Sequence, residues 1–442
     1  MLERWFQLKA NGSTVGRELL GGVTTFLTLS YILFVQPGVL QQAGMDFQAV
    51  MVATCLSSAL ATLLMGLSAN YPVALAPGMG ENFFFVYTLC GVYGLSWQQA
   101  LAATFLAGVA FMVLSLFGLR SRLVNSIPAS LQTGIAAGIG LFITLIGLQY
   151  GRLVVAHPTT LLQLGDLRSP VALTALAGLL LTLALTGLRV RGAILLGILG
   201  SLLVAAAFGL VRFAGVFSIP RGLGATLWKV DFAGLTKLDP ATVAAAIFVL
   251  LFLAVFDTVG TLVGVGRQAG LMKDGKLPRA ERALFCDATG TVAGAALGTS
   301  TITCYIESAA GVSDGARTGL ANLMTGSLLL ASAFFIPLAK MIGGGVSLPG
   351  GGVAYPILAP ALILVGAMML RSVRELKWDD ATEAVPAYFT MVLIPFSFSI
   401  AAGVAAGFFF YAAAKLLTGR AKQCPALVYV FALLYLVQYL VR

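Results

Sequence analysis

Charged residues are scarce in this chain: they make up only 10% of its 442 residues, whereas hydrophobic residues make up 59% and the mean hydropathy is +0.96. A water-soluble protein of this length could bury a large core, but it would also need a polar surface. The sequence has too little polar material to build one. A soluble globular fold is therefore excluded, and much of the surface must face a lipid bilayer.

Histidine and cysteine are too few and too scattered to build a metal centre or a disulfide framework. The single histidine, His157, lies in a predicted external loop, and the five cysteines form no CxxC motif and no cluster with it. The chain also lacks HExxH and any paired Ser/Lys or Ser/His candidate. We therefore expect no metal and no cofactor. The alternative from another functional class is a membrane-embedded enzyme, but the sequence shows no set of catalytic residues for one.

Long apolar runs recur from end to end, which is typical of transmembrane helices. The first run, from about Gly21, is followed by many others and has no small-residue cleavage site, so it is interpreted as a span and not as a signal peptide. The apolar tail 425–441 lies along the membrane or within the protein. We expect fourteen spans, near 20–36, 48–67, 73–90, 97–119, 128–150, 170–188, 191–210, 241–265, 281–297, 299–315, 317–339, 352–371, 382–394 and 398–415.

Basic residues are divided unevenly between the two sides that these spans define. Twenty of the 27 Lys and Arg residues fall on the side that holds both termini. The positive-inside rule makes this side cytoplasmic, so we expect a multi-pass protein of the inner (cytoplasmic) membrane with both termini in the cytoplasm. The net charge of +10 then reflects topology, and we expect no nucleic-acid partner. The seven basic residues on the external side are Arg152, Arg168, Arg212, Arg221, Lys229, Lys237 and Lys340.

The long polar connection at about 211–240 divides the spans into seven on each side. Because seven is an odd number, any repeat of one half in the other must be inverted in the membrane. The expected fold is an all-α polytopic membrane protein with a 7+7 inverted repeat.

The third span of each half is interrupted at a matching place. The first, ALAPGMGENFFFVY (74–87), is broken by proline and glycine, and the second, GTSTITCYIESAAG (298–311), carries polar and β-branched residues that favour a short strand. Extended pieces at 73–79 and 299–305 can pair and so satisfy backbone groups that hydrocarbon leaves unsatisfied. Each would lead into a half-helix whose positive N-terminus faces a ligand at the bilayer centre. The alternative is a pair of packing kinks.

Four acidic residues lie well inside apolar spans: Glu81, Asp257, Asp287 and Glu307. An ionisable group there costs about 2.5–3.5 kcal/mol on insertion scales, and no Lys or Arg lies deep in a span to pair with these acids. A medium of low dielectric favours the protonated form of a carboxyl group. All four acids are therefore candidates for carrying a proton.

Each candidate also has a structural interpretation. Asp257 and Glu307 can form hydrogen bonds that merely pack helices, and Asp287, in a span of small residues, can do the same. Glu81 can cap its own half-helix. Phe83 can stack on a flat ligand or simply pack in the core.

Several stretches of the sequence closely resemble AzgA-like purine permeases, which belong to the nucleobase–cation symporter group that also contains uracil and xanthine permeases. They are GGVTTFLTLSYILFVQP (21–37), APGMGENFFFVYT (76–88), FDTVGTLVGVGRQAGL (256–271), KLPRAERALFCDATGTVAGA (276–295), GTSTITCYIESAAGVSDGARTGL (298–320) and WDDATEAVPAYFTMVLIPFSFSIAAG (378–403).

The resemblance implies fourteen spans in two inverted repeats that build a core domain and a gate domain. The core comprises 1–126 (spans 1–4) and 241–340 (spans 8–11). The gate comprises 127–240 (spans 5–7) and 341–442 (spans 12–14 and the C-terminal apolar helix). It further implies a homodimer formed through the gate, and proton-coupled import by an elevator-like movement of the core.

Carried over position by position, the resemblance implies that Asp257 and Glu307 bind the base. A purine edge offers adjacent N–H donors, which a carboxylate can accept in pairs. The other substrate-binding candidates are Thr261, Thr25, Phe26, Gly80, Glu81, Asn82, Phe83, Tyr305 and Ser308, and the proton-coupling candidates are Glu307, Asp257, Asp287 and Glu81. In one departure, the position of Glu81 is more often apolar in this family.

The sequence thus predicts proton-coupled import of purine nucleobases (adenine, guanine and/or hypoxanthine) with no partner besides lipid and a second copy of the chain. The alternative is a transporter of anions or other small solutes with the same fold. The intramembrane acids, and the absence of an arginine facing the interior, argue against an anion.

Overall fold

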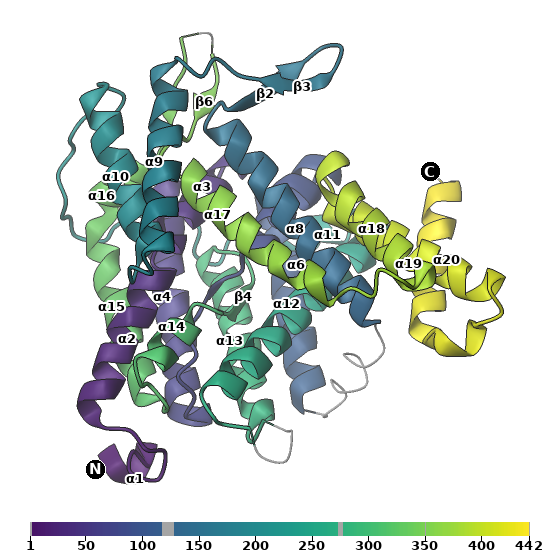
Figure 1. The fold of residues 1–442 in the computed structure, drawn as a ribbon, viewed down its shortest axis with the longest axis horizontal. Helices are drawn as coiled ribbons and strands as arrows, with labels where there is room; N and C mark the ends of the chain where they lie inside the picture. Colours follow the sequence, from purple (N-terminus) through teal and green to yellow (C-terminus); the bar gives the residue numbers. More distant parts are fainter. Residues whose placement is uncertain (1, 117–127, 273–276, 350, 442) are drawn as a thin grey trace.

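The computed structural model describes residues 2–116, 128–272, 277–349 and 351–441, and it is mostly helical. Figure 1 shows the long helices running side by side, with a hairpin of two strands projecting at one end of the bundle and the N-terminus at the other. The longer helices are α2 (Val15–Leu29), α3 (Ile32–Leu40), α4 (Phe47–Leu64), α6 (Trp97–Leu116), α8 (Ala129–Tyr150), α9 (Pro170–Gly187), α10 (Ala193–Ala207), α12 (Pro240–Gln268), α13 (Ala280–Leu297), α15 (Leu320–Ser332), α16 (Ile336–Gly343), α17 (Ala359–Met369), α18 (Ala381–Phe396), α19 (Ile400–Leu417) and α20 (Ala426–Val441).

The remaining elements are short. Helices α1 (Leu2–Phe6), α5 (Met79–Phe83), α11 (Phe232–Leu235) and α14 (Ser308–Ser313) have six residues or fewer, and α5 continues as a π-helix over Phe84–Val92. The strands are β1 (Leu75–Pro77), β2 (Val154–His157), β3 (Leu161–Leu164), β4 (Ile302–Cys304), β5 (Val346–Ser347) and β6 (Val353–Ala354).

The prediction of a multi-pass membrane protein is confirmed. Among the described residues, eight helical stretches are long and apolar enough to cross a membrane, and α10 and α18 are shorter apolar helices. The count of fourteen spans stays a prediction, because several expected spans are short or interrupted. The end of the fourth expected span (117–119), the boundary between 126 and 127, and five of the basic residues assigned to the cytoplasmic side lie outside the described residues: Arg120, Arg122, Lys273, Lys276 and Arg442.

The predicted pairing of the two interrupted spans is confirmed. Strands β1 and β4 form an antiparallel sheet in which Leu75 faces Cys304 and Pro77 faces Ile302. The ladder continues at both ends, since the Gly78 amide donates to the Thr301 carbonyl at 3.0 Å and the Tyr305 amide donates to the Ala74 carbonyl at 2.9 Å. The interruptions are therefore paired strands and not packing kinks.

Two threonines complete the outer edges of this small sheet. The Thr62 hydroxyl, from α4, accepts from the Leu75 amide at 2.9 Å and donates to the Leu75 carbonyl at 3.1 Å. The Thr291 hydroxyl, from α13, likewise accepts from the Ile302 amide at 3.1 Å and donates to the Ile302 carbonyl at 3.0 Å. A buried backbone needs such partners because no water reaches it. The same device in both halves supports the expected inverted repeat.

A close helix crossing beneath the sheet depends on a glycine. Helix α13 packs against α4, and a Cβ atom at Gly290 would lie only 2.7 Å from the Ala61 Cβ atom. Any larger side chain at Gly290 would push the two helices apart and displace Thr291, the next residue, from β4.

The helices pack in two groups, and each group draws on both halves of the chain. In one, α15 and α14 pack on α2, while α13 packs on α4 and α6. In the other, α8 packs on α17 and α18, α18 packs on α19, and α9 packs on α10. The apolar tail forms α20, which packs on α19 and stacks Phe431 on Phe248 of α12 at a centroid distance of 4.0 Å.

Candidate functional site

The strand crossing brings the starts of two short helices to the centre of the molecule. One residue, Gly78, separates β1 from α5, and three residues separate β4 from α14. Their N-cap residues, Gly78 and Glu307, make no side-chain hydrogen bond to the first turn. The free N–H groups of a first helical turn carry partial positive charge. Both helix starts therefore favour polar or anionic groups near the crossing.

Glu81 is buried in the first turn of α5, with 2% of its surface exposed. Its carboxyl group folds back over Gly78, where an added Cβ atom would collide with Glu81 Oε2 and with Thr303 Oγ1. This position agrees with the interpretation of Glu81 as a residue that serves its own half-helix. Glu81 is also within electrostatic range of Asp257 and Asp287, so it belongs to the acidic cluster.

Asp257 faces this cluster from α12, and the Thr303 side chain of β4 lies near its carboxyl group. Unlike Glu81, it is exposed, and the residues that follow on the same helical face, Gly260 and Gly264, are exposed too. A Cβ atom at Gly260 would meet nothing within 4 Å. The side of α12 next to Asp257 therefore borders open space.

The exposed face of α12 runs in one direction only. It continues from Asp257 to Arg267 and Gln268 at the end of the helix. In the opposite direction the same face is closed, because Leu253 and Leu250, one and two turns earlier, are buried. A carboxylate turned towards lipid would be costly. The face of α12 that carries Asp257 is therefore exposed from Asp257 to the Gln268 end of the helix.

Glu307 is held in place by a tyrosine from another span. The Tyr31 hydroxyl donates to Glu307 Oε1 at 2.7 Å, and the Thr28 hydroxyl donates to the Glu307 carbonyl at 3.3 Å. The hydroxyl of Tyr305 donates to the Pro77 carbonyl at 2.5 Å. In the described residues, no side chain other than Tyr31 donates to the Glu307 carboxylate, so Oε2 can accept from a ligand. The carboxyl group is partly exposed and within electrostatic range of Asp257.

Asp287 lies on α13 and is fully buried. Its Oδ2 atom accepts from the Thr258 hydroxyl of α12. The Thr258 hydroxyl also lies 3.4 Å from the Cys304 amide of β4. This geometry agrees with the interpretation of Asp287 as a helix-packing acid, and it places Asp287 behind the strand.

The other predicted site residues fall into two groups. Thr25, Ser308, Tyr305 and Thr261 lie around the two acids: a Cβ atom at Gly311 of α14 would collide with Thr25 Oγ1, Ser308 Oγ accepts from the Ala74 amide at 3.0 Å, and Thr261 is buried one turn after Asp257. Phe26 packs at the edge of the large apolar core.

Gly80, Asn82 and Phe83 lie on the α5 side, where α5 meets α8. A Cβ atom at Gly80 would lie 3.2 Å from Ile139 of α8. Asn82 Oδ1 accepts from the Ser300 hydroxyl at 2.5 Å, while its Nδ2 atom is buried without a partner. Phe83 is fully buried against Tyr87 and Phe142. As placed here, Phe83 packs between helices.

A second layer of aromatic and polar side chains crosses from α5 to α8. The Tyr87 hydroxyl donates to Gln42 Oε1 at 2.9 Å, and Gln42 Nε2 donates to the Tyr150 hydroxyl. Phe142 and Phe398 pack edge-on against Tyr87. This layer joins the two helix groups on the side of the acids that lies away from the Gln268 end of α12.

Sequence reasoning missed three residues of the site: Tyr31, Thr303 and Thr258. Tyr31 lies inside the quoted stretch TFLTLSYILF, where a hydroxyl among apolar residues was a usable signal. Thr303 and Thr258 were visible only as neighbours of recognised residues. Their contacts depend on the register of β4 against β1 and on the position of α12, which the sequence does not specify.

The site is an acidic cluster without basic partners. In the described parts of the chain, the three ion pairs involve Asp314, Glu383 and Asp380, none of which belongs to the cluster. No group of three or more His, Cys, Asp or Glu side chains within these parts is arranged to hold a metal ion. The arrangement can accept hydrogen bonds from a neutral ligand rich in N–H groups, and it can take up protons.

Comparison with known proteins agrees with this chemistry. The sequence model of the Permease family (Xan_ur_permease) matches residues 16–408. The chain is 41% identical to the adenine permease AdeP of Escherichia coli over 439 residues, which is 99% of this chain and 96% of that protein. It is 40% identical to the guanine/hypoxanthine permease PbuG of Bacillus subtilis, covering 97% of each.

Solved structures share the fold at low sequence identity. The transmembrane domain of the cyanobacterial bicarbonate transporter BicA matches with a TM-score of 0.65 and 16% identity, covering 88% of this chain and 97% of that domain. The murine anion transporter Slc26a9 in its inward-facing state matches with a TM-score of 0.60 and 11% identity, covering 91% and 68%. By its sequence, its fold and its membrane-spanning helices, this chain belongs to the Permease family and is a transporter, not an enzyme.

Proposed function

We propose that this chain imports purine nucleobases, adenine, guanine or hypoxanthine, and that Asp257 and Glu307 bind the base. The observation that carries the proposal is the placement of two acids on facing elements, α12 and the β4–α14 turn, both accessible and without a basic partner in the described site. The relatives that are adenine and guanine/hypoxanthine permeases support this substrate class.

The geometry around Glu307 suits a purine edge. Tyr31 occupies Oε1 at 2.7 Å, which fixes the plane of the carboxyl group and leaves Oε2 for a ring N–H. Asp257 supplies a second acceptor from the opposite side, and the start of α5 supplies N–H donors for ring nitrogens. A neutral, flat ligand with both donors and acceptors satisfies all of these groups at once.

The two layers that flank this site support alternating access to it. The exposed face of α12 gives a path from Asp257 to the Gln268 end, whereas the Tyr87–Gln42–Tyr150 chain closes the other side. With both termini in the cytoplasm, as the distribution of basic residues favours, the open side is cytoplasmic. The structure then corresponds to an inward-open state in the inner membrane.

We further propose that the protein works as an elevator with the domain boundaries expected above. The two helix groups support this division, because each combines elements of both halves and they meet at α5 and α8. The group containing α2, α4, α12 and α14 is the moving core, and the group containing α8, α17, α18 and α19 is the gate. Fourteen spans and a homodimer through the gate complete the proposal.

Proton coupling is the second part of the proposal. A proton taken up by the acidic cluster from outside would offset its negative charge and favour entry of the base, and release to the cytoplasm would follow the movement of the core. Glu307 and Asp257 are the first candidates because they are accessible, and Glu81 is electrostatically linked to Asp257 and to Asp287.

An anion is the competing substrate, since two solved proteins of this fold are described as bicarbonate and anion transporters. The chemistry of the site argues against it. Four acids near the crossing would repel a negative ligand, and the three ion-paired bases of the described residues lie elsewhere.

Uptake in a cell that lacks its own purine permeases tests the proposal. Labelled adenine, guanine and hypoxanthine are offered separately, with xanthine, uracil and bicarbonate as competitors. We expect uptake of at least one of the three purines, competition by purines and no competition by bicarbonate. Uptake that only bicarbonate inhibits would overturn the substrate class.

The coupling is tested separately: the medium should become alkaline during uptake, and a protonophore should abolish this change. The variant Glu307→Gln should lose uptake, and its matched control is Glu281→Gln, which changes an exposed acid on α13.

A further inference from the structure

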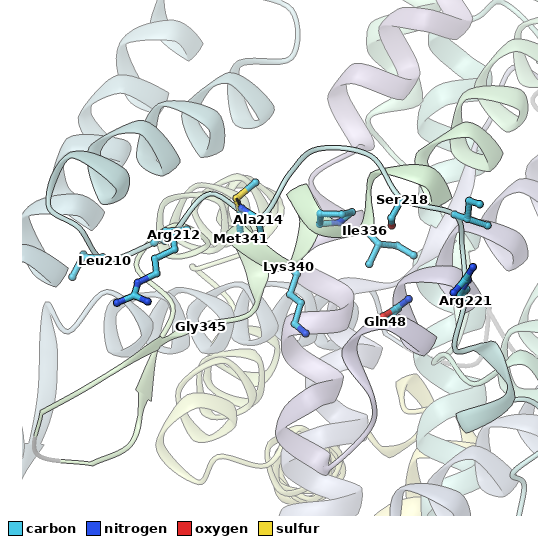
Figure 2. A pocket seen from close by; sticks show the side chains of 13 residues that line it. Gln48, Leu210, Arg212, Ala214, Ser218, Arg221, Ile336, Lys340, Met341 and Gly345 are labelled. Atoms are coloured by element: carbon cyan, nitrogen blue, oxygen red, sulfur yellow. Dashed lines mark hydrogen bonds between the residues drawn. The ribbon is translucent and has the colours of Figure 1, made fainter.

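A cavity that shares no lining residue with the acidic cluster lies beside the predicted external connection at about 211–240. Its volume is about 650 Å³, and its walls are the chain from Leu210 to Arg221, helix α16 and the start of α4. Three basic residues, Arg212, Arg221 and Lys340, line it, and no acidic residue does. Figure 2 shows Lys340 between the two arginines along one side of this chain segment.

The concentration of charge here is unusual for this side of the molecule. Only seven Lys and Arg residues are expected on the external side, and three of them line this one cavity. In the described residues, the ion pairs use Arg191, Lys415 and Arg420, so Arg212, Arg221 and Lys340 remain without a carboxylate. Uncompensated cations around a cavity attract an anion.

The cavity is also firmly built. The segment that supplies both arginines is fastened to the short turn between α15 and α16 and to α16 itself, because the Ser218 amide donates to the Phe334 carbonyl at 2.8 Å and the Ala214 amide lies 3.3 Å from Met341 Sδ. The ring of Phe217 stacks on Phe334 with centroids 5.3 Å apart. The positions of the basic residues therefore do not depend on a free loop.

The surroundings of the cavity are those of a membrane–water interface. Large apolar side chains of the same segment are exposed: the exposed fraction of the residue surface is 81% for Phe213, 66% for Phe217 and 64% for Ile219. Ile336, Pro337 and Met341 form an apolar wall inside. Exposed apolar side chains that lie together can contact the acyl chains of a lipid. An occupant must therefore combine an anionic group with an apolar part.

We propose that this cavity binds the phosphodiester headgroup of an anionic phospholipid. Arginine forms paired hydrogen bonds with phosphate oxygens, and lysine adds a point charge. A cavity of this volume exceeds the needs of a single inorganic phosphate and admits a whole headgroup, while the acyl chains lie along the exposed aromatic residues. Basic pockets between transmembrane helices on the cytoplasmic side hold anionic lipid headgroups, and the same pairing of charges applies to a basic cavity on the external side.

Such a lipid would touch both helix groups. The segment 210–221 follows α10, whereas α16 and the start of α4 belong with α3 and α15. The bound headgroup would join two parts that shift relative to each other during transport. Lipid binding itself, however, does not rest on the proposed function and can be measured without any transport assay.

The test is retention of lipid by the purified full-length chain, measured by native mass spectrometry. The probes are phosphatidylglycerol, phosphatidylcholine and inorganic phosphate. We expect the wild type to retain phosphatidylglycerol in preference to phosphatidylcholine. The affinity for phosphatidylglycerol should fall at least about tenfold in the triple variant Arg212→Ala/Arg221→Ala/Lys340→Ala. The control Arg152→Ala/Arg168→Ala/Lys237→Ala removes the same external charge away from the cavity and should bind as the wild type does.

Two outcomes would overturn the proposal. Equal retention of phosphatidylglycerol by the triple variant and the wild type would show that the cavity holds no lipid headgroup. Stabilisation by inorganic phosphate with no preference for phosphatidylglycerol would make this a site for a free anion. Should the triple variant fail to fold, the wild type alone decides: added salt should remove its preference for phosphatidylglycerol, because the attraction is electrostatic, and a preference that resists salt contradicts the proposal.

Discussion

Each of the two helix groups contains a cluster of charged side chains, and the two clusters differ in how their charges are compensated. In the α8–α18–α19 group, Lys415 Nζ lies 2.6 Å from Glu383 Oε1 and 2.8 Å from Thr382 Oγ1. Ser130 and Tyr411 donate to the same carboxylate at 2.5 and 2.9 Å. At the strand crossing, by contrast, the acids face hydroxyl groups, helix starts and open space.

The difference separates charges that hold the structure together from charges that serve a ligand. A buried ion pair whose hydrogen bonds are all made within the protein has no free donor or acceptor for a substrate. Glu307 is different, because one carboxylate oxygen accepts from Tyr31 and the other can still accept a hydrogen bond from a substrate. The predictions below break the first cluster and then test the second in finer steps.

Breaking the paired cluster should give the largest loss of stability. Glu383→Ala leaves Lys415 buried without its counter-ion, which typically costs about 3–5 kcal/mol in the free energy of unfolding. Denaturation of the purified protein measures this loss. The double variant Glu383→Gln/Lys415→Met, which removes both charges, should regain much of the stability, and a single variant that unfolds like the wild type would contradict the assignment.

Glu307→Gln should weaken purine binding while leaving the fold intact. The amide keeps the shape of the side chain but loses a charged acceptor, which is worth about 1.5–3 kcal/mol, or roughly a 10- to 100-fold loss of affinity. Binding of labelled purine to the purified chain measures the effect. Unchanged affinity, or a stability loss as large as that of Glu383→Ala, would place Glu307 with the structural charges.

Tyr31→Phe should have a smaller effect of the same kind. It removes the hydroxyl that holds Glu307 Oε1 at 2.7 Å and leaves the ring in place. A net hydrogen bond is worth about 0.5–1.5 kcal/mol, so we expect affinity to fall roughly two- to tenfold. In the Glu307→Gln background the same change should matter less, because the two residues act together. Additive effects would show that Tyr31 does not act through Glu307.

Arg191→Gln should be the mildest change. Arg191 lies 2.5 Å from Asp314 Oδ1, yet 61% of its side chain is exposed, and exposed ion pairs contribute about 0–1 kcal/mol. Thr24 also donates to Asp314 at 2.6 Å, so the acid keeps a partner. The midpoint of thermal denaturation should shift little. A shift comparable to that of Glu383→Ala would mean that this exposed ion pair stabilises the protein as much as the buried one does.

The sequence predicted the parts of the site that depend on local chemistry. Acids inside apolar spans and interruptions at matching places are visible without a structure, and β1, β4, Asp257 and Glu307 were expected for these reasons. The contacts between distant elements were not predictable. Tyr31 contacts Glu307 although the two residues lie 276 positions apart in the chain. Asn82 faces Ser300 only in the observed register of β1 against β4, and the sequence does not distinguish this register from one shifted by a single residue.

Different causes explain the open points of the fold prediction. Hydropathy identifies long helices well, but α18 and the interrupted third and tenth spans are short or irregular, so a count of spans depends on how breaks are treated. The role of Phe83 was also open, because an aromatic residue packs equally well on a ligand or on Tyr87 and Phe142, and only the placement of α8 decides between them.

The β1–β4 sheet also constrains how the protein can be made. Strand β1 is synthesised more than two hundred residues before β4, and Thr62 serves only the outer edge of β1 at Leu75. The inner edge keeps its backbone groups unmet until Ile302–Cys304 enters the membrane. The first half of the chain is therefore expected to complete its packing only after the second half has been inserted, because β4 supplies the missing hydrogen bonds.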